Sequence, residues 1–552
     1  MPRCGHPWAW RALLMLDTMN SRTLWMPLVA FVGLIGHAHA DAPDIRGLFP
    51  AGARAGHDTV LRIIGKPGTA PLAIWTDRPE VVVTPTDKPE AFLLKTPAEC
   101  RPGVVWLRWH NAEGASELRP VVIGTLPELT ETEPNNAAKE AQPVAALPGV
   151  MNGVLAKRGD VDTYAVALTA GQTLVASVEA HRTLPSPMDA VLQVADAQGF
   201  VIEQNEDRHD SDPLIAWTVP RAGTYLVRVF AFPTQTDSSI NYYGADTAVY
   251  RLTLTTGPVI DQIIPLVRQP GPVTARGWNL PTTELVLIAE GASLRFDPAM
   301  GVHPIPGFEL DQLPRPVGTV HREDPAAESL TVSLPATVSG AIESAGDRDR
   351  YRFTATKGQS IRFQATARSL GSLADVVLRL LKADGSELKQ VDDTEKAADP
   401  HWTHAIPADG EYLVEVADRF RFGSDQHFYA LTMQVTAPEF TLSIPANRYI
   451  AEATKPVEIP VTITRQGLSV PMTITVNGLP AGVTCETVTS APEGETSKAV
   501  TLKLVVTPEA ATFSGPLRIV GRITGPDSEQ AATAPIEGVE ARTAAVWLTV
   551  KK

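Results

Sequence analysis

The residues that could perform catalysis are dispersed along this sequence of 552 residues. A nucleophilic hydrolase needs a Ser or Cys beside a base and an oxyanion hole, yet no G-x-S-x-G segment occurs in the sequence. The 12 His residues form no H-E-x-x-H zinc motif. His401 and His404 lie close together, but on a strand residues three apart face opposite sides. The sequence therefore predicts a non-catalytic protein, although a glycosidase-type pair of carboxylates cannot be recognised from sequence.

Acidic residues, in contrast, come in groups. The motif Gly-Asp-x-Asp occurs at Gly159–Asp162 and again at Gly346–Asp349. A third group surrounds His209 and consists of Asp207, Asp210 and Asp212. Carboxylates at this density repel one another unless a cation lies among them, and calcium prefers such hard oxygen ligands. For the third group, a polar loop and a second ion site are both open interpretations.

The charge of the chain excludes some partners. The sequence has 48 Lys+Arg against 62 Asp+Glu, a net charge of −14. This excess of negative charge argues against binding to nucleic acid or to anionic lipid. Cys100 and Cys485 are far apart in the sequence, so we expect neither a disulfide nor a zinc site.

The first 40 residues have the pattern of an export signal. Arg22 precedes an uncharged apolar stretch over residues 24–36, and Ala38-His39-Ala40 then offers a cleavage point. The stretch is too short to span a membrane as a helix. Met19 is a better start for such a leader than Met1, and an uncleaved anchor is the alternative. We therefore expect an exported protein, periplasmic, cell-surface or extracellular, without a transmembrane segment after signal cleavage.

The remainder reads as an array of β-strands. Apolar residues alternate with polar ones over many short segments, such as 174–180, 429–435, 457–463 and 502–506. Alternation of this kind indicates strands with one buried face, and the Gly- and Pro-rich turns between them indicate sandwiches or barrels. Pro460 within one segment predicts an edge strand. The fold class we predict is all-β, a tandem array of Ig-like and jelly-roll-like β-sandwich modules.

An internal duplication organises these strands. Eleven residues after the first Asp of each Gly-Asp-x-Asp motif comes Gly-Gln, at 171–172 and at 358–359. Residues 220–227 then parallel residues 407–414, and each copy closes on a strand led by Tyr, at Tyr250 and Tyr429. We predict these modules: a signal peptide at 1–40, Ig/TIG-like at 41–126, the first long repeat at 127–257, a short Ig/TIG-like module at 258–320, the second long repeat at 321–437, and an Ig-like sandwich at 438–552.

The long repeats resemble a known family. Residues 131–255 carry Glu131-Thr-Glu133-Pro-Asn135-Asn136, Gly159-Asp160-Val-Asp162-Thr-Tyr164, Ala170-Gly171-Gln172, Asp189 and Gly223-Thr-Tyr225 in order. This series resembles the bacterial pre-peptidase C-terminal (PPC) domain, and residues 323–437 resemble it more weakly. The resemblance implies a jelly-roll-like sandwich that occurs beside secreted proteases or in large secreted proteins.

The same resemblance implies a calcium site in the first repeat. Related collagen-binding modules bind calcium through an acidic leader segment and an Asp pair near the first core strand. Carried over to this sequence, the candidate ligands are Glu131, Glu133, Asn135, Asn136, Asp160 and Asp162. Four carboxylates and two amides could supply the six or more oxygens that calcium takes. A solvated acidic linker with turn-forming Asp residues is the alternative.

The second repeat departs from this pattern. If Asp324-Pro325 is aligned with Glu133-Pro134, Ala326 and Ala327 stand where the two Asn residues stood. Two oxygen ligands are then missing, and we expect little or no calcium binding there.

Taken together, these patterns predict an exported binding or structural protein whose ligand is an extracellular polymer, a surface or another protein. The alternative is a carbohydrate-binding accessory protein, or a non-catalytic partner of a secreted peptidase or hydrolase. Exposed aromatic side chains would favour the carbohydrate interpretation, and the candidates around the first repeat are Trp217, Phe230, Phe232, Tyr242 and Tyr243.

Overall fold

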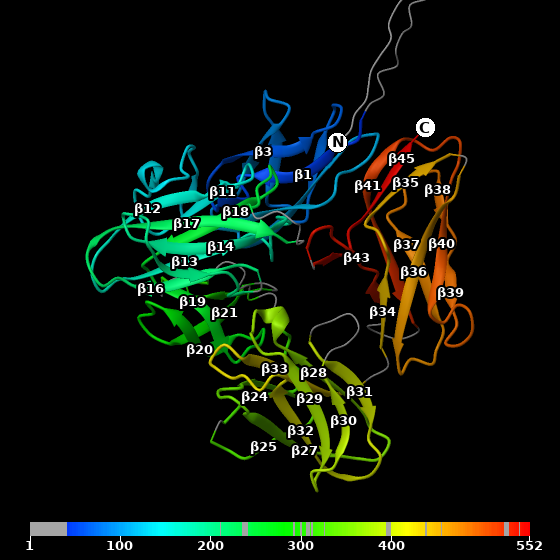
Figure 1. The fold of residues 1–552 in the computed structure, drawn as a ribbon. Helices are drawn as coiled ribbons and strands as arrows, with labels where there is room; N and C mark the ends of the chain where they lie inside the picture. Colours follow the sequence, from blue (N-terminus) through cyan, green and yellow to red (C-terminus); the bar gives the residue numbers. More distant parts are fainter. Residues whose placement is uncertain are drawn as a thin grey trace, which may run out of the picture. The chain divides into compact units, whose positions relative to one another are not determined.

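A computed structural model describes residues 41–209, 211–234, 241–290, 293–297, 301–304, 310, 313–324, 326–392, 399–436, 439–453, 455–523, 529–539 and 541–551. The predicted signal peptide lies outside these residues. Within them the chain forms β-strands and short 3-10 turns such as Ala138–Glu140 and Arg368–Leu370. No helix of the described part is long and apolar enough to cross a membrane. The all-β prediction is confirmed (Figure 1).

The first pair of sheets lies between residues 44 and 124. One sheet has the order β1-β3-β6-β5 and the other β2-β8-β7-β4. Their inner faces enclose a core that includes Leu61, Phe92 and Trp109, all almost fully buried. The strands are β1 (Asp44–Phe49), β2 (Gly52–Arg54), β3 (Thr59–Lys66), β4 (Ala73–Thr76), β5 (Val82–Pro85), β6 (Ala91–Lys95), β7 (Gly103–His110) and β8 (Arg119–Gly124).

The second pair of sheets forms the first long repeat. The orders are β10-β12-β17-β14-β15 and β16-β13-β18-β11-β9. A core of aliphatic and aromatic side chains, among them Tyr164 and Tyr250, lies between them. The strands are β9 (Glu128–Thr130), β10 (Gln142–Pro143), β11 (Gly149–Val154), β12 (Asp162–Leu168), β13 (Thr173–Glu179), β14 (Met188–Ala195), β15 (Val201–Asn205), β16 (Leu214–Thr218), β17 (Gly223–Pro233) and β18 (Val249–Thr255).

A single sheet follows, with the order β22-β21-β20-β19-β23. Ile260, Ile263 and Leu287 belong to its buried side. Its strands are β19 (Val259–Ile264), β20 (Gly271–Trp278), β21 (Glu284–Glu290), β22 (Ser293–Phe296) and β23 (His303–Pro304).

The second long repeat has the same topology as the first. Its sheets, β25-β27-β32-β29-β30 and β24-β26-β33-β28-β31, have strand orders that match those of the first repeat strand for strand. This correspondence confirms the internal duplication. The strands are β24 (Thr319–Arg322), β25 (Leu330–Thr331), β26 (Ala336–Ala341), β27 (Arg348–Ala355), β28 (Ser360–Thr366), β29 (Val376–Lys382), β30 (Glu387–Val391), β31 (His401–Ala405), β32 (Gly410–Asp418) and β33 (Phe428–Val435).

The last strands form two further sheets and a small ribbon. The sheets have the orders β34-β36-β40-β38 and β35-β45-β41-β37-β39, with β42 pairing β41, and β43 pairs β44. The strands are β34 (Glu439–Ser443), β35 (Arg448–Glu452), β36 (Val457–Gln466), β37 (Met472–Asn477), β38 (Val483–Cys485), β39 (Val488–Ser490), β40 (Ala499–Val506), β41 (Phe513–Arg522), β42 (Glu529–Ala531), β43 (Ala534–Pro535), β44 (Arg542–Thr543) and β45 (Val546–Lys551).

Two local predictions need correction. β36, which contains Pro460, is an inner strand between β34 and β40. Pairing with β34 ends at Thr462, so the position of Pro460 lies beyond that ladder and its missing N–H costs no ladder bond. The alternation in β13 does not leave one face wet either: Ser177 and Glu179 are buried, and Glu179 pairs with Arg251. Cys100 and Cys485 are both free thiols, as expected.

Candidate metal centre

The acidic residues of the first repeat come from two neighbouring elements. Glu131 directly follows β9, and its N–H donates to the Asn152 carbonyl of β11, so the parallel pairing continues into the acidic segment. Its Oε1 accepts a bond from the Val154 N–H at 2.9 Å. Asp160 lies in the turn before β12, and Asp162 begins that strand. Gly159 supports the turn with a φ of 82°, a conformation that favours glycine.

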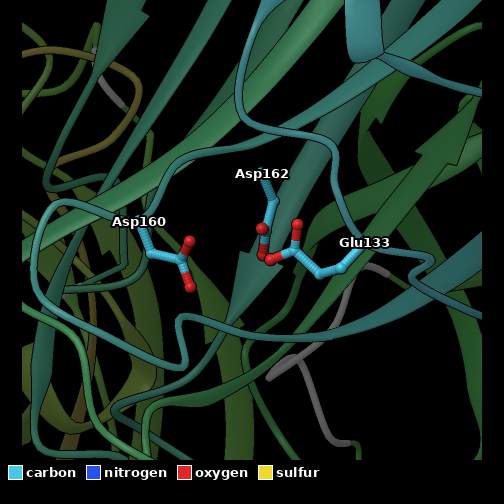
Figure 2. Close-up of side chains that lie close together, drawn as sticks. All are labelled: Glu133, Asp160 and Asp162. Carbon is cyan, nitrogen blue, oxygen red and sulfur yellow. The ribbon is translucent and has the colours of Figure 1, made fainter.

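Three carboxylates converge at this point. One oxygen each from Glu133, Asp160 and Asp162 lie within 4.8 Å of one another (Figure 2). Both Asp side chains are fully buried, whereas Glu133 is exposed. Burial of like charges this close together is costly unless a proton or a cation compensates them.

Protein hydrogen bonds satisfy only part of this oxygen set. Asp160 Oδ2 accepts from the Ala156 N–H at 2.6 Å, and Asp162 Oδ2 accepts from the Tyr250 hydroxyl at 2.5 Å. The Tyr250 hydroxyl also contacts that of Tyr164 at 2.6 Å. One buried oxygen on each of three carboxylates has no hydrogen-bond partner: Oε2 of Glu131, Oδ1 of Asp160 and Oδ1 of Asp162. Buried polar atoms are nearly always paired, so these oxygens indicate that a proton or a cation is shared among them.

The two asparagines behave differently. Asn135 is fully buried, and neither its Oδ1 nor its Nδ2 has a hydrogen-bond partner. Its backbone holds it in place, since its N–H donates to Glu133 and its carbonyl accepts from Thr163. Asn136 is only partly buried, and its Oδ1 accepts from the Val161 N–H at 3.0 Å. Asn136 therefore supports the turn before β12, while Asn135 keeps an oxygen available.

Burial changes the acidity of the carboxyl groups. Burial, followed by the nearby Asp162 carboxylate, raises the pKa of Glu131 well above its usual value. Burial also raises the pKa of Asp162, although bonds from Glu131 and Tyr250 oppose the shift. The carboxyl groups of Glu131 and Asp162 contact each other directly, a contact that requires a shared proton or a shared cation. The centre is therefore either protonated or metal-bound at neutral pH.

The donor set defines the kind of cation that fits. The converging side chains offer only carboxylate, amide and hydroxyl oxygens, which suit calcium or magnesium rather than zinc or copper. Five of the six predicted residues supply an oxygen that is unpaired or part of the carboxylate cluster, and Asn136 is the exception. Sequence reasoning missed the role of Tyr250, although the Tyr at the head of the last strand is a repeated feature of both copies.

The second repeat contains a reduced version of this centre. The pairing of β24 with β26 places Glu323 at the position of Glu131, and its Oε2 accepts from the Ala341 N–H at 2.7 Å. Tyr429 donates to Asp349 and contacts Tyr351, as Tyr250 does in the first copy. Asp347 differs, because its Oδ2 accepts from Glu343 N–H and its Oδ1 from Arg348 N–H.

The leader segment of the second repeat is also changed. Asp324 accepts a bond from the N–H two residues later, as Glu133 does. However, one residue fewer separates Asp324 from the end of the β24–β26 ladder than separates Glu133 from the end of the β9–β11 ladder. The alignment of Asp324 with Glu133 therefore holds for the loop, with one residue deleted. Ala326 and Ala327 are exposed and carry no side-chain oxygen. Among the described residues, no buried side-chain oxygen of Glu323, Asp347 or Asp349 lacks a partner.

In the acidic group around His209, Asp212 has a structural role. Asp212 is buried and accepts bonds from the backbone N–H groups of Ala180, His181 and Arg182. His209 pairs with Asp261 at 3.0 Å. Asp210 lies outside the described residues. The oxygens of Asp212 are occupied by the loop that they hold, which favours the polar-loop interpretation over a second ion site.

Comparison with known proteins identifies both repeats. Residues 160–231 and 347–418 each match the family model of the bacterial pre-peptidase C-terminal domain. A probable subtilase-type serine protease of Deinococcus radiodurans is 28% identical over 171 residues, which make up 30% of this chain and 22% of that protein. This chain therefore matches well under two thirds of the relative's length.

Solved structures similar to parts of the chain include a domain of a bacterial collagenase and a bacterial periplasmic protein. The pre-peptidase C-terminal domain of a Bacillus anthracis collagenase is 12% identical with a TM-score of 0.16, and the match covers 20% of this chain and 99% of that one. PliG from Aeromonas hydrophila, a periplasmic inhibitor of g-type lysozyme, is 16% identical with a TM-score of 0.14, and the match covers 21% and 96% of the two chains.

Proposed function

Because this chain contains two bacterial pre-peptidase C-terminal domains, we propose that it is an exported, non-catalytic binding or structural protein with calcium in the first of them. The proposed modules are those expected from the sequence, with PPC domains at 127–257 and 321–437. The dispersal of catalytic residue types and the match to a segment of a subtilase-type protein support an accessory role. Its ligand would be an extracellular polymer, a surface or another protein.

The observation that carries the calcium proposal is the group of buried, unpaired oxygens on Glu131, Asn135, Asp160 and Asp162. A calcium ion among them would supply the missing positive charge and satisfy them together. Glu133 would complete the set from the exposed side. Calcium would thereby tie the leader segment after β9 to the start of β12 and stiffen this end of the sandwich.

The role of the surrounding residues follows from their bonds. Tyr250 holds one oxygen of Asp162 and leaves the other for the ion, while the Ala156 N–H does the same for Asp160. Val154 and the Asn152 carbonyl fix Glu131 at the edge of β11. The donors are thus prearranged by strand pairing, so little ordering would remain at the moment of binding.

The test is metal analysis and calcium titration of the whole chain with two matched variants. We expect calcium to co-purify and to raise the melting temperature, and Asp160→Asn to weaken calcium binding by about 100-fold. Asp347→Asn, the equivalent change in the second PPC domain, should leave the calcium response unchanged. The proposal fails if calcium produces no thermal shift in the wild-type protein, or if the two variants lose it equally.

The aromatic residues of the first PPC domain give little support to a carbohydrate surface there. Trp217 and Phe230 are buried, and Phe230 packs on Tyr242 at 4.5 Å between ring centroids. Phe232 is exposed, but it contacts both of these rings. The cluster thus acts as a small core on the outer face of this sheet.

A further inference from the structure

The outer face of sheet β25-β27-β32-β29-β30 carries three guanidinium groups around one carboxylate. Arg350 and Arg379 are the cross-strand neighbours of Glu415 on either side. Arg350 Nη2 and Arg379 Nη1 lie 2.9 and 3.2 Å from the Glu415 oxygens, and Arg348 Nη1 lies 2.8 Å away. The Arg side chains are 39%, 37% and 33% exposed in chain order, whereas that of Glu415 is 2% exposed.

This cluster contains more positive than negative charge. Burial disfavours the charge of Glu415, but the bond from Arg350 and the charges of Arg348 and Arg350 keep the pKa of this carboxyl below its usual value. Arg379 Nε also lies 3.5 Å from an oxygen of Glu387, so two carboxylates face three guanidinium groups. A guanidinium has five N–H donors, and two carboxylates cannot accept from all fifteen of them. On the solvent side of the cluster, the planar guanidinium groups therefore present N–H donors in the arrangement that pairs with carboxylates.

The first PPC domain lacks this arrangement. At the positions of Arg350, Glu415 and Arg379 it has Thr163, Arg228 and Gln193, paired across the strands in the same way. The residue equivalent to Arg348 is Val161, which is buried with Val191 and Phe230 under Tyr242.

The second domain has Ala417 where the first has Phe230. The aromatic cover is therefore lost in the second domain, and Arg348 remains accessible beside its cross-strand neighbour Ala417.

Two exposed phenylalanines lie in the loop that follows β32, at the end of the sheet where Arg348 pairs with Ala417. Phe420 and Phe422 are 63% and 62% exposed, with ring centroids 6.4 Å apart and planes tilted by 34°. Both of their N–H groups donate to Asp418 Oδ1, at 2.9 and 2.8 Å. Arg421 between them has a positive φ of 61°, and its carbonyl accepts from the N–H of Gly346, two residues before Arg348. The loop is therefore fixed in a shape that holds both rings in water.

We propose that the face formed by Arg348, Arg350, Arg379, Phe420 and Phe422, the Arg–Phe surface, binds an acidic polysaccharide. Sugar rings present C–H groups that pack on aromatic faces, and their carboxylates would pair with the guanidinium groups. Because both rings stand on an open surface rather than in a pocket, the surface suits the broad C–H faces of sugar rings better than the side chains of an acidic peptide. The inference rests on the proposed binding role and names its ligand.

The test is binding of polygalacturonate to the whole chain, with dextran as a neutral polymer and polyglutamate as an acidic peptide. We expect binding to polygalacturonate that weakens with salt, because the charged groups are exposed and screened. Binding should persist in EGTA, since the Arg–Phe surface lies outside the calcium centre. Loss of binding in EGTA would instead place the ligand at the first domain and overturn the inference, whereas failure of the calcium test alone would leave this result intact.

Variants assign the binding to the Arg–Phe surface. The combination Arg350→Thr, Glu415→Gln and Arg379→Gln removes two of the three guanidinium groups together with the buried carboxylate. The net charge of the cluster therefore falls by one, and no charged Glu415 is left buried without a partner. We expect it to weaken binding about tenfold or more, and Phe420→Ser with Phe422→Ser to do likewise. Phe200→Ser, at a phenylalanine that is 73% exposed in the first domain, is the matched control. Unchanged binding in both variants, or equal affinity for dextran or polyglutamate, would refute the proposal.

Discussion

The two PPC domains have the same strand order and the same tyrosine pair, yet their acidic centres have diverged. In the first domain, Asp160 and Asp162 each keep a buried oxygen without a partner. In the second, both oxygens of Asp347 accept backbone N–H groups, and the residue is only partly buried. The same fold can therefore hold an acidic centre with unpaired buried oxygens or a self-sufficient turn, depending on a few loop residues. What remains in the second domain is the contact of Glu323 with Asp349 beneath Tyr429.

The largest expected difference between the domains is in their response to pH and calcium. Burial raises the pKa of Glu131 and Asp162 in the first domain and of Asp349 and Glu323 in the second. The folded state then holds protons that the unfolded state has lost. Without calcium, the free energy of unfolding therefore falls as pH rises from about 4 to the raised pKa of the buried carboxyls, which is about 10 for Glu131 and about 9 for Asp349.

Calcium should reverse this trend in the first domain only, because its ligands must be deprotonated. We expect a gain of about 2.7 kcal/mol for the first domain when free calcium is about 100-fold above its dissociation constant. Hydrogen exchange in peptides that contain Val154 and Ala341 reports on each domain separately, since these N–H groups bond to Glu131 and Glu323. Equal protection of both peptides by calcium would contradict the comparison.

Neutralising the Asp at the start of the first core strand should have opposite effects on the stability of the two domains when calcium is present. Asp349→Asn keeps an acceptor for Tyr429 and removes the cost of keeping this buried carboxyl protonated at neutral pH, so we expect the second domain to gain about 1 kcal/mol there. Asp162→Asn should stabilise the calcium-free first domain similarly but remove most of the calcium response. Calorimetry with and without EGTA measures both effects. A loss of stability for Asp349→Asn at neutral pH would show that surrounding groups stabilise the ionised form of Asp349, which would contradict this prediction.

The smallest effect is expected from restoring the missing amides. Ala326→Asn with Ala327→Asn introduces two oxygen donors into an exposed loop of the second domain, and such surface changes alter stability by about 0.5 kcal/mol or less. We expect no calcium binding to appear, because Asp347 remains engaged by the Glu343 and Arg348 N–H groups. A calcium-dependent thermal shift in this variant would mean that the amides alone distinguish the two centres.

Much of the architecture was predictable from residue patterns. The period of two in segments such as 499–506 became a strand with alternating exposed and buried side chains. The repeated motifs at 159–164 and 346–351 correspond to the same turn and strand in both domains. Pro460 misled the prediction because strand partners have different lengths, which no local pattern reveals. Asn136 was a reasonable ligand by type, but its oxygen faces the Val161 N–H.

The sequence by itself determined the all-β fold, the duplication and the acidic residue types near β12, because side-chain alternation and turn chemistry are local properties. Only the tertiary structure decided which carboxylates meet without hydrogen-bond partners. That outcome depends on strand pairing, which brings Glu131 and Tyr250 to Asp162 from segments far apart in the chain. The same holds for the Arg–Phe surface, where three arginines gather on Glu415 through the register of neighbouring strands.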